Sequence, residues 1–284
     1  MTTISQTLPA TRPERPQKVR KPRTRFGDKL LYSYTWLVIL WLMAPIAVMI
    51  LFSFNNTPGR YNTTWRGFTL KWYSTSKLGE FSDLTTAVKA SLEIVVVATI
   101  GSVLLGTLIG LALGKYRFRG QAVLNLVLFA CIAAPEIVMG ASLLSFFTQL
   151  GVARGMMTII IAHIMFSLSF VAVIVRARVL TLDPSIEEAA KDLGASAFTT
   201  FRRVTLPMIF PAVLSGGLLA FVLSIDDFVV TNFTAGGVTT FPMWIFGTAK
   251  LGMPPQVNVI GTLIFLGGLV LAAINLMASR RQNR

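Results

Sequence analysis

The stretch EEAAKDLGAS, residues 187–196, is polar and rich in alanine, yet long apolar runs precede and follow it. The chain of 284 residues is 54% hydrophobic and only 13% charged, whereas soluble domains carry about 25% charged residues. Several of its apolar runs are long enough to cross the hydrocarbon core of a bilayer, which is about 30 Å thick. The sequence therefore predicts an all-α, polytopic membrane protein, in which residues 187–196 need a separate explanation.

Six membrane spans are predicted where apolar runs alternate with charged breaks. They cover residues 30–54, 88–114, 122–149, 157–180, 210–231 and 257–279. In the third span Pro135 precedes Glu136, which predicts a kinked or broken helix because proline removes a backbone hydrogen bond. The basic tail, residues 1–29, lacks apolar periodicity and is predicted to be disordered, so the membrane domain covers residues 30–284.

Basic residues indicate the orientation of these spans. Most of the 26 Lys and Arg lie in the N-terminal tail, in KYRFRG at 115–120, in the segment after the fourth span and at the C-terminus. Because cytoplasmic loops carry an excess of Lys and Arg, both termini and residues 187–196 are predicted to lie in the cytoplasm. The net charge of +14 thus reflects membrane topology, and we expect no nucleic-acid partner.

The residues before the polar stretch have the pattern of a helix start. Asp183 precedes Pro184, and Ser185 with Glu188 has the spacing of a capping box. Carboxylates in the first turn also complement the positive end of the helix dipole. The sequence therefore predicts a short helix that begins close to Pro184.

Two interpretations of this helix stay open from its residues alone. Its apolar face is small and consists of Ala189, Ala190 and Leu193. Gly194 is typical of a helix stop, after which a second helical stretch is predicted to run to Pro207, where the chain turns back into the membrane. The first helix is either a docking element for another protein or an amphipathic connector on the membrane surface.

Three glycines of the second span, Gly106, Gly110 and Gly114, recur every four residues. This spacing places them on one helix face, where the missing side chains let another helix approach closely. We therefore predict a helix-packing face. Cys131 and His163 also lie within spans; Cys131 is interpreted as a small buried hydrophobic residue and His163 as a hydrogen-bonded packing residue.

Four acidic residues lie within the predicted spans: Glu93, Glu136, Asp226 and Asp227. A charged side chain at the middle of a membrane helix costs roughly 2.5–3.5 kcal/mol on insertion scales, so each needs a role. We predict that they line a passage for a cationic solute; the alternative is a helix cap or a hydrogen bond between subunits. Because consecutive residues lie about 100° apart on a helix, Asp226 and Asp227 cannot both face one narrow passage.

The chain offers no catalytic or metal-binding constellation. One His and one Cys cannot form a metal cluster, no nucleophile is paired with a base, and the phosphate-binding pattern G-x-x-x-x-G-K-[ST] is absent. We therefore expect a non-catalytic membrane subunit that binds no metal and no cofactor itself.

The segment 183–207 resembles the EAA loop of ABC-importer permeases. Glu188-Ala189-Ala190 is followed by Gly194 and, after nine residues, by Val204-x-Leu206-Pro207, with valine in place of the family's isoleucine. The resemblance implies that this segment is a coupling loop whose helix docks on an ATPase. The residues that it assigns to this role are Glu187, Glu188, Ala189, Ala190, Asp192, Leu193, Gly194, Val204, Leu206 and Pro207.

Further stretches are similar to the permeases of spermidine/putrescine importers. They are SFN at 53–55, FTLKWY at 68–73, KYRFRG at 115–120, APEIVMG at 134–140 and LSIDDFVVTNF at 223–233. The resemblance implies the type I ABC-importer permease fold, a place in the bacterial inner membrane and the transport of polyamines. It also implies a second permease that completes a heterodimer, two ATPase subunits that bind ATP and Mg, and an extracytoplasmic substrate-binding protein. Membrane lipid is a further expected partner of this chain.

Two alternative functions stay open. A related ABC importer for another small solute would share the coupling loop. A secondary transporter driven by an ion gradient would use the intramembrane acids as ion sites. Such transporters are typically built from inverted repeats with broken helices, however, and only one broken span is predicted here.

Overall fold

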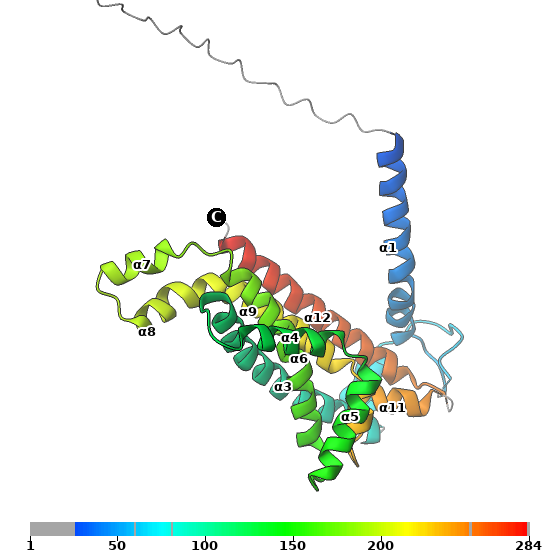
Figure 1. Cartoon of the computed structure of the whole chain (residues 1–284). Coiled ribbons are helices and arrows are strands. Elements are labelled where there is room, and N and C mark those ends of the chain that lie inside the picture. The colour runs from blue at the N-terminus through cyan, green and yellow to red at the C-terminus, as the bar shows by residue number, and fades with distance from the viewer. Residues whose placement is uncertain (1–25, 60, 81, 250–251, 283–284) are drawn as a thin grey trace, which may run out of the picture. The chain divides into compact units, whose positions relative to one another are not determined.

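The computed structural model describes residues 26–59, 61–80, 82–249 and 252–282 (Figure 1). Over these ranges the secondary structure is helical, apart from one isolated β-bridge between Asn55 and Phe68, so the predicted all-α class is confirmed. The predicted tail, residues 1–29, lies outside the described residues except for residues 26–29, which belong to the first helix.

Twelve α-helices and two short helical turns, η1 and η2, follow one another along the described chain. Their bounds are α1 (Phe26–Ser53), η1 (Lys71–Tyr73), α2 (Thr75–Leu78), α3 (Ser82–Lys115), α4 (Gln121–Ala133), α5 (Glu136–Gln149), α6 (Met156–Val179), α7 (Ser185–Asp192), α8 (Ala197–Thr200), η2 (Phe201–Thr205), α9 (Leu206–Ile225), α10 (Val229–Thr234), α11 (Phe241–Thr248) and α12 (Pro255–Gln282). Five helices are long and apolar enough to cross a membrane, and the bent pair α4–α5 makes a sixth span if it is counted as one. The prediction of about six spans is therefore confirmed.

The chain divides after Val48 into two compact units, and helices α3 to α12 belong to the second. Within that unit α6 is the central helix, packed against α3, α9 and α10. Its side chains Val171 and Val175 are completely buried and join Leu111 of α3 and Ile209 of α9 in one apolar cluster. The core thus lies along α6, and the neighbouring spans surround it.

The glycines of α3 set the distance between α3 and α6. A Cβ atom added to Gly106 would lie 2.7 Å from Cβ of Val171, and one added to Gly110 would lie 2.7 Å from the carbonyl oxygen of Ala172. Added to Gly114, it would lie 2.6 Å from a methyl carbon of the α6 residue Val179. All three glycines therefore face α6, and any side chain there would force the two helices apart.

The third span is broken. Helices α4 and α5 meet at an angle of 111° with Ala134 and Pro135 between them, so the predicted break at Pro135 is confirmed. Pro135 has an extended backbone (ψ 129°), which ends helical hydrogen bonding on its N-terminal side. The second half, α5, packs against α6 and α10 through Met139, Leu143 and Val230.

The fifth span differs from the prediction at both ends. Instead of residues 210–231, one continuous helical segment runs from Ala197 to Ile225, and the chain breaks before α10. The predicted turn at Pro207 is therefore wrong. Pro207 lies inside this continuous segment, two residues after the wide π-helical turn η2.

The connection between α1 and α3 is built around the buried side chain of Asn55. Its amide donates to Asn62 Oδ1 and to the carbonyl of Thr64, both at 2.7 Å, and its oxygen accepts from the N–H of Arg66. The indole N–H of Trp72 donates to the Asn55 carbonyl at 2.8 Å. These bonds satisfy a buried amide completely and give this connection a defined shape.

Candidate functional site

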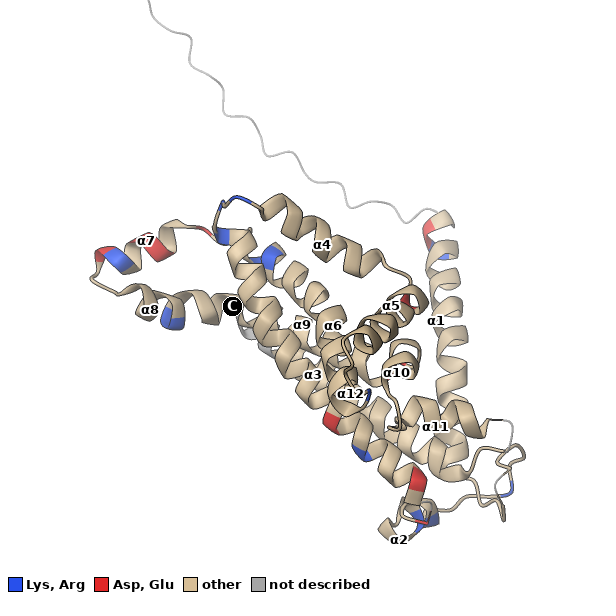
Figure 2. Cartoon of the chain, turned by 60° about the horizontal axis from the view of Figure 1, so that its bottom comes forward, with Lys and Arg blue, Asp and Glu red and all other residues tan. Residues whose placement is uncertain are grey.

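The coupling segment, residues 183–207, leaves the membrane-spanning helices at one end of the second unit. Charged residues gather on α7, on η2 and at the adjoining end of α3 (Figure 2). The carboxylate of Asp183 accepts a hydrogen bond from the backbone N–H of Ser185 at 2.9 Å, and the bonds from Ser185 lower the pKa of Asp183. The predicted capping box is therefore wrong. Pro184, which directly precedes α7, already has a helical backbone, so Ser185 lies inside the helix. The carboxylate of Asp183 accepts the hydrogen bond from the Ser185 N–H.

Helix α7 ends at Asp192, and Gly194 adopts a left-handed backbone conformation (φ +85°). Its N–H donates to the carbonyl of Lys191 at 2.8 Å, and the next N–H, that of Ala195, donates to the carbonyl of Ala190 at 3.1 Å. This arrangement satisfies carbonyls at the end of the helix in the way that a C-terminal glycine permits. The chain is thereby directed into the separate helix α8.

The two adjacent glutamates of α7 have different surroundings. Glu187 Oε1 accepts hydrogen bonds from Lys115 Nζ at 2.5 Å and from the hydroxyl of Thr205 at 2.6 Å. Partial burial raises the pKa of Glu187, but the bonds from Lys115 and Thr205 and the charges of Lys115 and Lys191 outweigh it, so the pKa lies below its ordinary value. The side chain of Glu188 is exposed.

The apolar side chains of this segment divide into two groups. Leu193 is 90% exposed and Phe198 is 71% exposed, which is unusual for large apolar residues and typical of an interaction surface. Leu206, in contrast, packs against the apolar cluster of α6 and α9. The tip of the coupling segment therefore offers apolar contacts to the outside, while its base is part of the core. Of the other predicted coupling residues, Ala189, Asp192 and Pro207 are exposed, and Ala190 and Val204 are half-buried.

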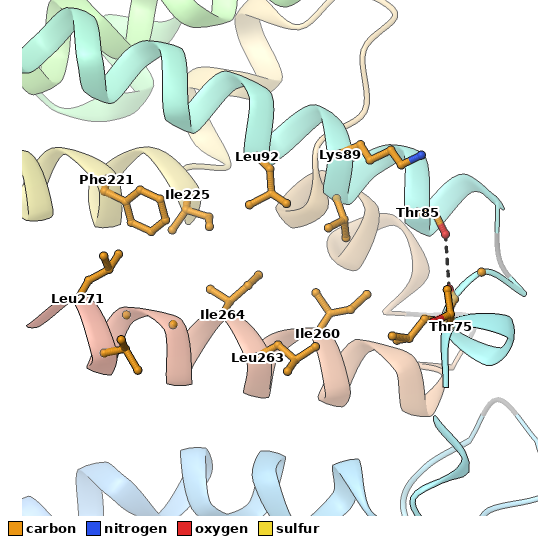
Figure 3. Close-up of a pocket in the computed structure, with 16 residues that line it drawn as sticks. Thr75, Thr85, Lys89, Leu92, Phe221, Ile225, Ile260, Leu263, Ile264 and Leu271 are labelled. Carbon is orange, nitrogen blue, oxygen red and sulfur yellow. Dashed lines mark hydrogen bonds between the residues drawn. The ribbon is translucent and has the colours of Figure 1, made fainter. Parts of the chain in front are cut away.

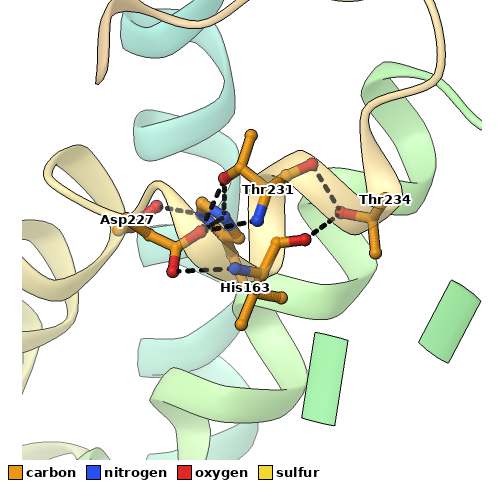
Figure 4. A network of polar contacts seen from close by, with 6 residues as sticks. His163, Asp227, Thr231 and Thr234 are labelled. Atoms are coloured by element: carbon orange, nitrogen blue, oxygen red, sulfur yellow. Dashed lines mark hydrogen bonds and ion pairs between the residues drawn. The ribbon is translucent and has the colours of Figure 1, made fainter. Parts of the chain in front are cut away.

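Asp227 belongs to a buried polar network at the break between α9 and α10 (Figure 4). Its Oδ2 atom lies 3.3 Å from Nε2 of His163 and accepts hydrogen bonds from the N–H and the hydroxyl of Thr231, both at 2.7 Å. The other ring nitrogen of His163, Nδ1, lies 2.7 Å from the hydroxyl of Ser224. The network joins α6 to both sides of the break, and it makes His163 a buried residue with hydrogen-bond partners at both ring nitrogens.

Asp226 has a different environment although it is the neighbouring residue. It lines a cavity of about 600 Å³ together with side chains of α11 and α12. Among the lining residues, Phe228 and Phe246 lie with their ring centroids 4.6 Å apart. A carboxylate beside aromatic rings is an arrangement that attracts an organic cation.

The other two intramembrane acids lie elsewhere. Glu136 is the exposed first residue of α5, at the bend of the third span, and Glu93 lies on an exposed face of α3. Neither is among the residues that line the Asp226 cavity. The structure therefore brings none of the four acids together except the adjacent pair Asp226 and Asp227, whose side chains serve different surroundings.

A larger cavity of about 890 Å³ lies between α3 and α12 and reaches Phe221 and Ile225 of α9 (Figure 3). Its lining is almost entirely apolar, and of the described residues that line it Lys89 alone is charged. An apolar groove with a positive charge at its edge offers nothing to a polycation. This cavity is therefore a poor site for a cationic solute, in contrast to the smaller one at Asp226.

Sequence reasoning missed the contact of Lys115 with the coupling segment. Lys115 belongs to KYRFRG, whose basic residues serve as topology signals in the prediction. Its partner Glu187 follows 72 residues later, and no periodicity relates the two positions. The signal that was available is the place of Lys115 directly after Gly114, at the end of the face that packs on α6.

Comparison with known proteins places this architecture in a family. Residues 106–283 match the family described as the inner membrane component of binding-protein-dependent transport systems. The chain is 38% identical over 259 residues to the spermidine/putrescine transport system permease protein PotC of Escherichia coli, covering 91% of this chain and 97% of that protein. It is also 38% identical over 265 residues to the putrescine transport system permease protein PotI of Escherichia coli, covering 90% and 91% of the two chains.

The chain belongs to this family of inner-membrane transport permeases. Its fold is also found in the crystal structure of a bacterial ABC transporter involved in the import of the acidic polysaccharide alginate, with a TM-score of 0.62. That comparison covers 92% of this chain and 99% of the other at 16% identity, so it bears on the fold alone. The chain is thus a multi-pass permease of the ABC-importer type.

Proposed function

We propose that the chain is the permease subunit of an ATP-driven polyamine importer. The observation that carries this proposal is the 38% identity that extends over nearly the whole of two polyamine permeases. The dependence of the family on a binding protein supports an extracytoplasmic substrate-binding partner. A second permease and two ATPase subunits complete the assembly that we propose.

The coupling segment is the proposed docking site for the ATPase. Exposed Leu193 and Phe198 provide apolar contacts at its tip, and the exposed carboxylate of Glu188 provides a charge beside them. The chain contains no phosphate-binding loop of its own, so ATP and Mg bind to the partner. The distribution of Lys and Arg supports a cytoplasmic position for this segment and for both termini.

The Asp226 cavity is the proposed contact point for the solute within this subunit. A polyamine carries ammonium groups along a flexible alkyl chain, so it needs carboxylates for charge and aromatic or apolar surfaces for the chain. Asp226 supplies the carboxylate, and Phe228 and Phe246 supply the aromatic surface. Asp227 has its charge directed to His163 and Thr231 and acts on the passage only through the position of Asp226.

The decisive experiment is uptake by the complete assembly in proteoliposomes. With ATP on the side of α7 and loaded binding protein on the other, labelled spermidine or putrescine should enter, and an ATPase subunit unable to hydrolyse ATP should abolish uptake. Uptake driven by a proton gradient without ATP would instead establish a secondary transporter. ATP-driven uptake of another solute in place of polyamines would support the permease and ATPase roles. It would refute polyamines as the substrate.

The docking surface can be tested separately. Leu193→Ser and Phe198→Ser together should reduce the amount of ATPase that co-purifies with the permease, because the apolar contacts are lost. Leu150→Ser is the matched control, since Leu150 is also exposed (61%) but lies at the end of α5, outside the coupling segment. Equal retention of the ATPase by both variants would place the docking site elsewhere.

A further inference from the structure

Three residues far apart in the sequence meet where the coupling segment joins the spans. Lys115 Nζ, at the end of α3, donates to Glu187 Oε1 of α7 at 2.5 Å and to the hydroxyl oxygen of Thr205 at 3.3 Å. The Thr205 hydroxyl donates in turn to the same Glu187 oxygen at 2.6 Å. We call these three residues the Lys115 triad. Each member thus contacts both others, and together they connect α3, α7 and the π turn η2.

The triad differs from an ordinary surface ion pair. The side chains of Lys115 and Glu187 are only 23% and 24% exposed, whereas those of the surface pair Lys77 and Glu80 are 47% and 48% exposed. Thr205 is buried. A partly desolvated pair that shares a buried hydroxyl is screened less by solvent and has fewer free rotamers than an exposed pair. The lowered pKa of Glu187 agrees with a carboxylate that stays charged in this position.

Among the described residues, the side-chain hydrogen bonds between α7 and the spans are those of the triad. A cavity of about 340 Å³ lies beside the triad and is lined by residues of α3, α7, α8 and η2, including Leu108, Tyr116 and Phe201. Helix α7 has no fully buried residue. Residues of α3 and α7 both line this cavity, and the triad connects the two helices beside it.

Thr205 is also the last residue of the π turn that leads into α9. A π turn accommodates an additional residue in one helical turn and often occurs at functional sites. The triad therefore holds α7 to α3 and, at the same time, holds the π turn at the base of α9. A displacement of α7 would reach both spans through three side chains.

We propose that Lys115, Glu187 and Thr205 are positioning residues that transmit the movement of α7 to spans α3 and α9 during transport. The proposal rests on the proposed function, in which a separate ATPase acts on α7. In this arrangement the two glutamates of the coupling helix have separate tasks. Glu187 faces inward and fastens the helix to its own subunit, and Glu188 is left exposed toward the ATPase.

The test measures how much solute is taken up for each ATP hydrolysed by the complete assembly. Glu187→Gln and Thr205→Val keep the side-chain volume but weaken the triad, so we expect assembly and hydrolysis to persist while uptake per ATP falls about tenfold. The double variant Lys115→Glu with Glu187→Lys should recover a clear part of that ratio, because the opposite charges are exchanged. Glu80→Gln, which removes an exposed ion pair at the other end of α3, is the matched control and should leave the ratio unchanged.

A second measurement does not depend on transport. Spin labels at Arg119, beyond the end of α3, and at Asp192, at the end of α7, report the distance between the two helices in the assembled complex. Glu187→Gln should broaden this distance distribution, and Glu80→Gln should not. An unchanged distribution together with an unchanged uptake per ATP would overturn the proposed role. If the wild-type complex hydrolysed no ATP but Glu187→Gln still broadened the distance distribution, the proposed function would be refuted. The connection of α3 to α7 through the triad would still stand.

Discussion

Oδ2 of Asp227 lies 3.3 Å from Nε2 of His163, and both side chains are almost completely buried. Asp226, one residue earlier, lines an aromatic cavity instead. The break between α9 and α10 makes this division possible, because outside a regular helix two consecutive side chains can face unrelated surroundings. The carboxylate of Asp227 is therefore bonded within the protein, while that of Asp226 is accessible to a solute.

Asparagine substitutions should separate these two roles. Asp226→Asn removes the charge that faces the cavity and keeps the shape, so uptake of spermidine should fall at least about tenfold, which corresponds to about 1.4 kcal/mol of lost interaction. Assembly and thermal stability should be unaffected. The comparison is made by initial uptake rates and by the melting temperature of the purified complex.

Glu93→Gln is the matched control for Asp226→Asn, since Glu93 is also an acidic residue of a span but lies on an exposed face of α3. It should leave uptake close to that of the unchanged protein. Equal losses of uptake in the two variants would mean that total negative charge, and not the Asp226 cavity, governs transport.

Asp227→Asn and His163→Ala should act on stability. Asp227→Asn replaces the charged partner of His163 by a neutral amide, and His163→Ala leaves the Ser224 hydroxyl, a buried hydrogen-bonding group, without its ring partner. Such a group costs about 1–3 kcal/mol, so the melting temperature and the yield of assembled complex should both decrease. If either variant assembled with unchanged stability but failed to transport, the network would be part of the passage.

The parts of the fold that are predictable from sequence are those determined locally. Apolar runs between charged residues indicate the spans, and Pro135 indicates the broken one, because proline removes a hydrogen bond wherever it stands. Pro207 shows the limit of that rule: the same residue is accommodated inside a continuous helix once a π turn precedes it. Such a turn depends on the packing of its side chains and has no local signature.

The candidate site shows the same limit. Helix geometry predicts that Asp226 and Asp227 do not share one passage, but in the structure the break between α9 and α10 separates their side chains. Which of them is buried depends on His163, whose place on α6 is set by packing against α3 and α9. The Lys115 triad likewise depends on contacts across 72 and 90 positions of the sequence. It could therefore be recognised only from the three-dimensional structure.

Alanine at Gly110 should destabilise the packing of α3 on α6. The new Cβ would lie 2.7 Å from the carbonyl oxygen of Ala172 and 2.9 Å from Cβ of Val175, and such overpacking costs about 1–3 kcal/mol. Gly267→Ala in α12 is the matched control, because nothing lies within 4 Å of a Cβ there. It should be neutral or stabilising by up to about 1 kcal/mol, the helix preference of alanine over glycine. Thermal unfolding of both variants in detergent measures the difference, and equal melting temperatures would contradict the close approach of the two helices.

The contribution of Glu187 to stability should depend on pH in a defined direction. Its pKa in the folded protein is lowered, so the carboxylate stabilises the fold fully above the ordinary range of glutamate, about 4.3. This stabilisation is lost as the pH falls through the lowered pKa. The difference in melting temperature between the unchanged protein and Glu187→Gln should therefore be constant between about pH 8 and pH 6 and shrink in acid. A difference that grew toward acid would show that the pKa is raised instead.

Substitutions of Gly194 should uncouple transport from ATP hydrolysis in an order set by backbone conformation. Gly194 has a left-handed φ of +85°, and nothing lies within 4 Å of a Cβ added there. A side chain at this position would therefore strain the backbone without clashing with another group. The left-handed conformation costs roughly 1–2 kcal/mol for most residues, and asparagine tolerates it better. Uptake per ATP should therefore decrease in the order glycine, asparagine, alanine and valine, although asparagine is larger than alanine. Insertion into the membrane should be equal for all four, as judged by the amount of folded permease recovered. If uptake per ATP followed side-chain volume instead, with asparagine below alanine, the glycine would be required for close contact with the ATPase and not for the direction of the chain between α7 and α8.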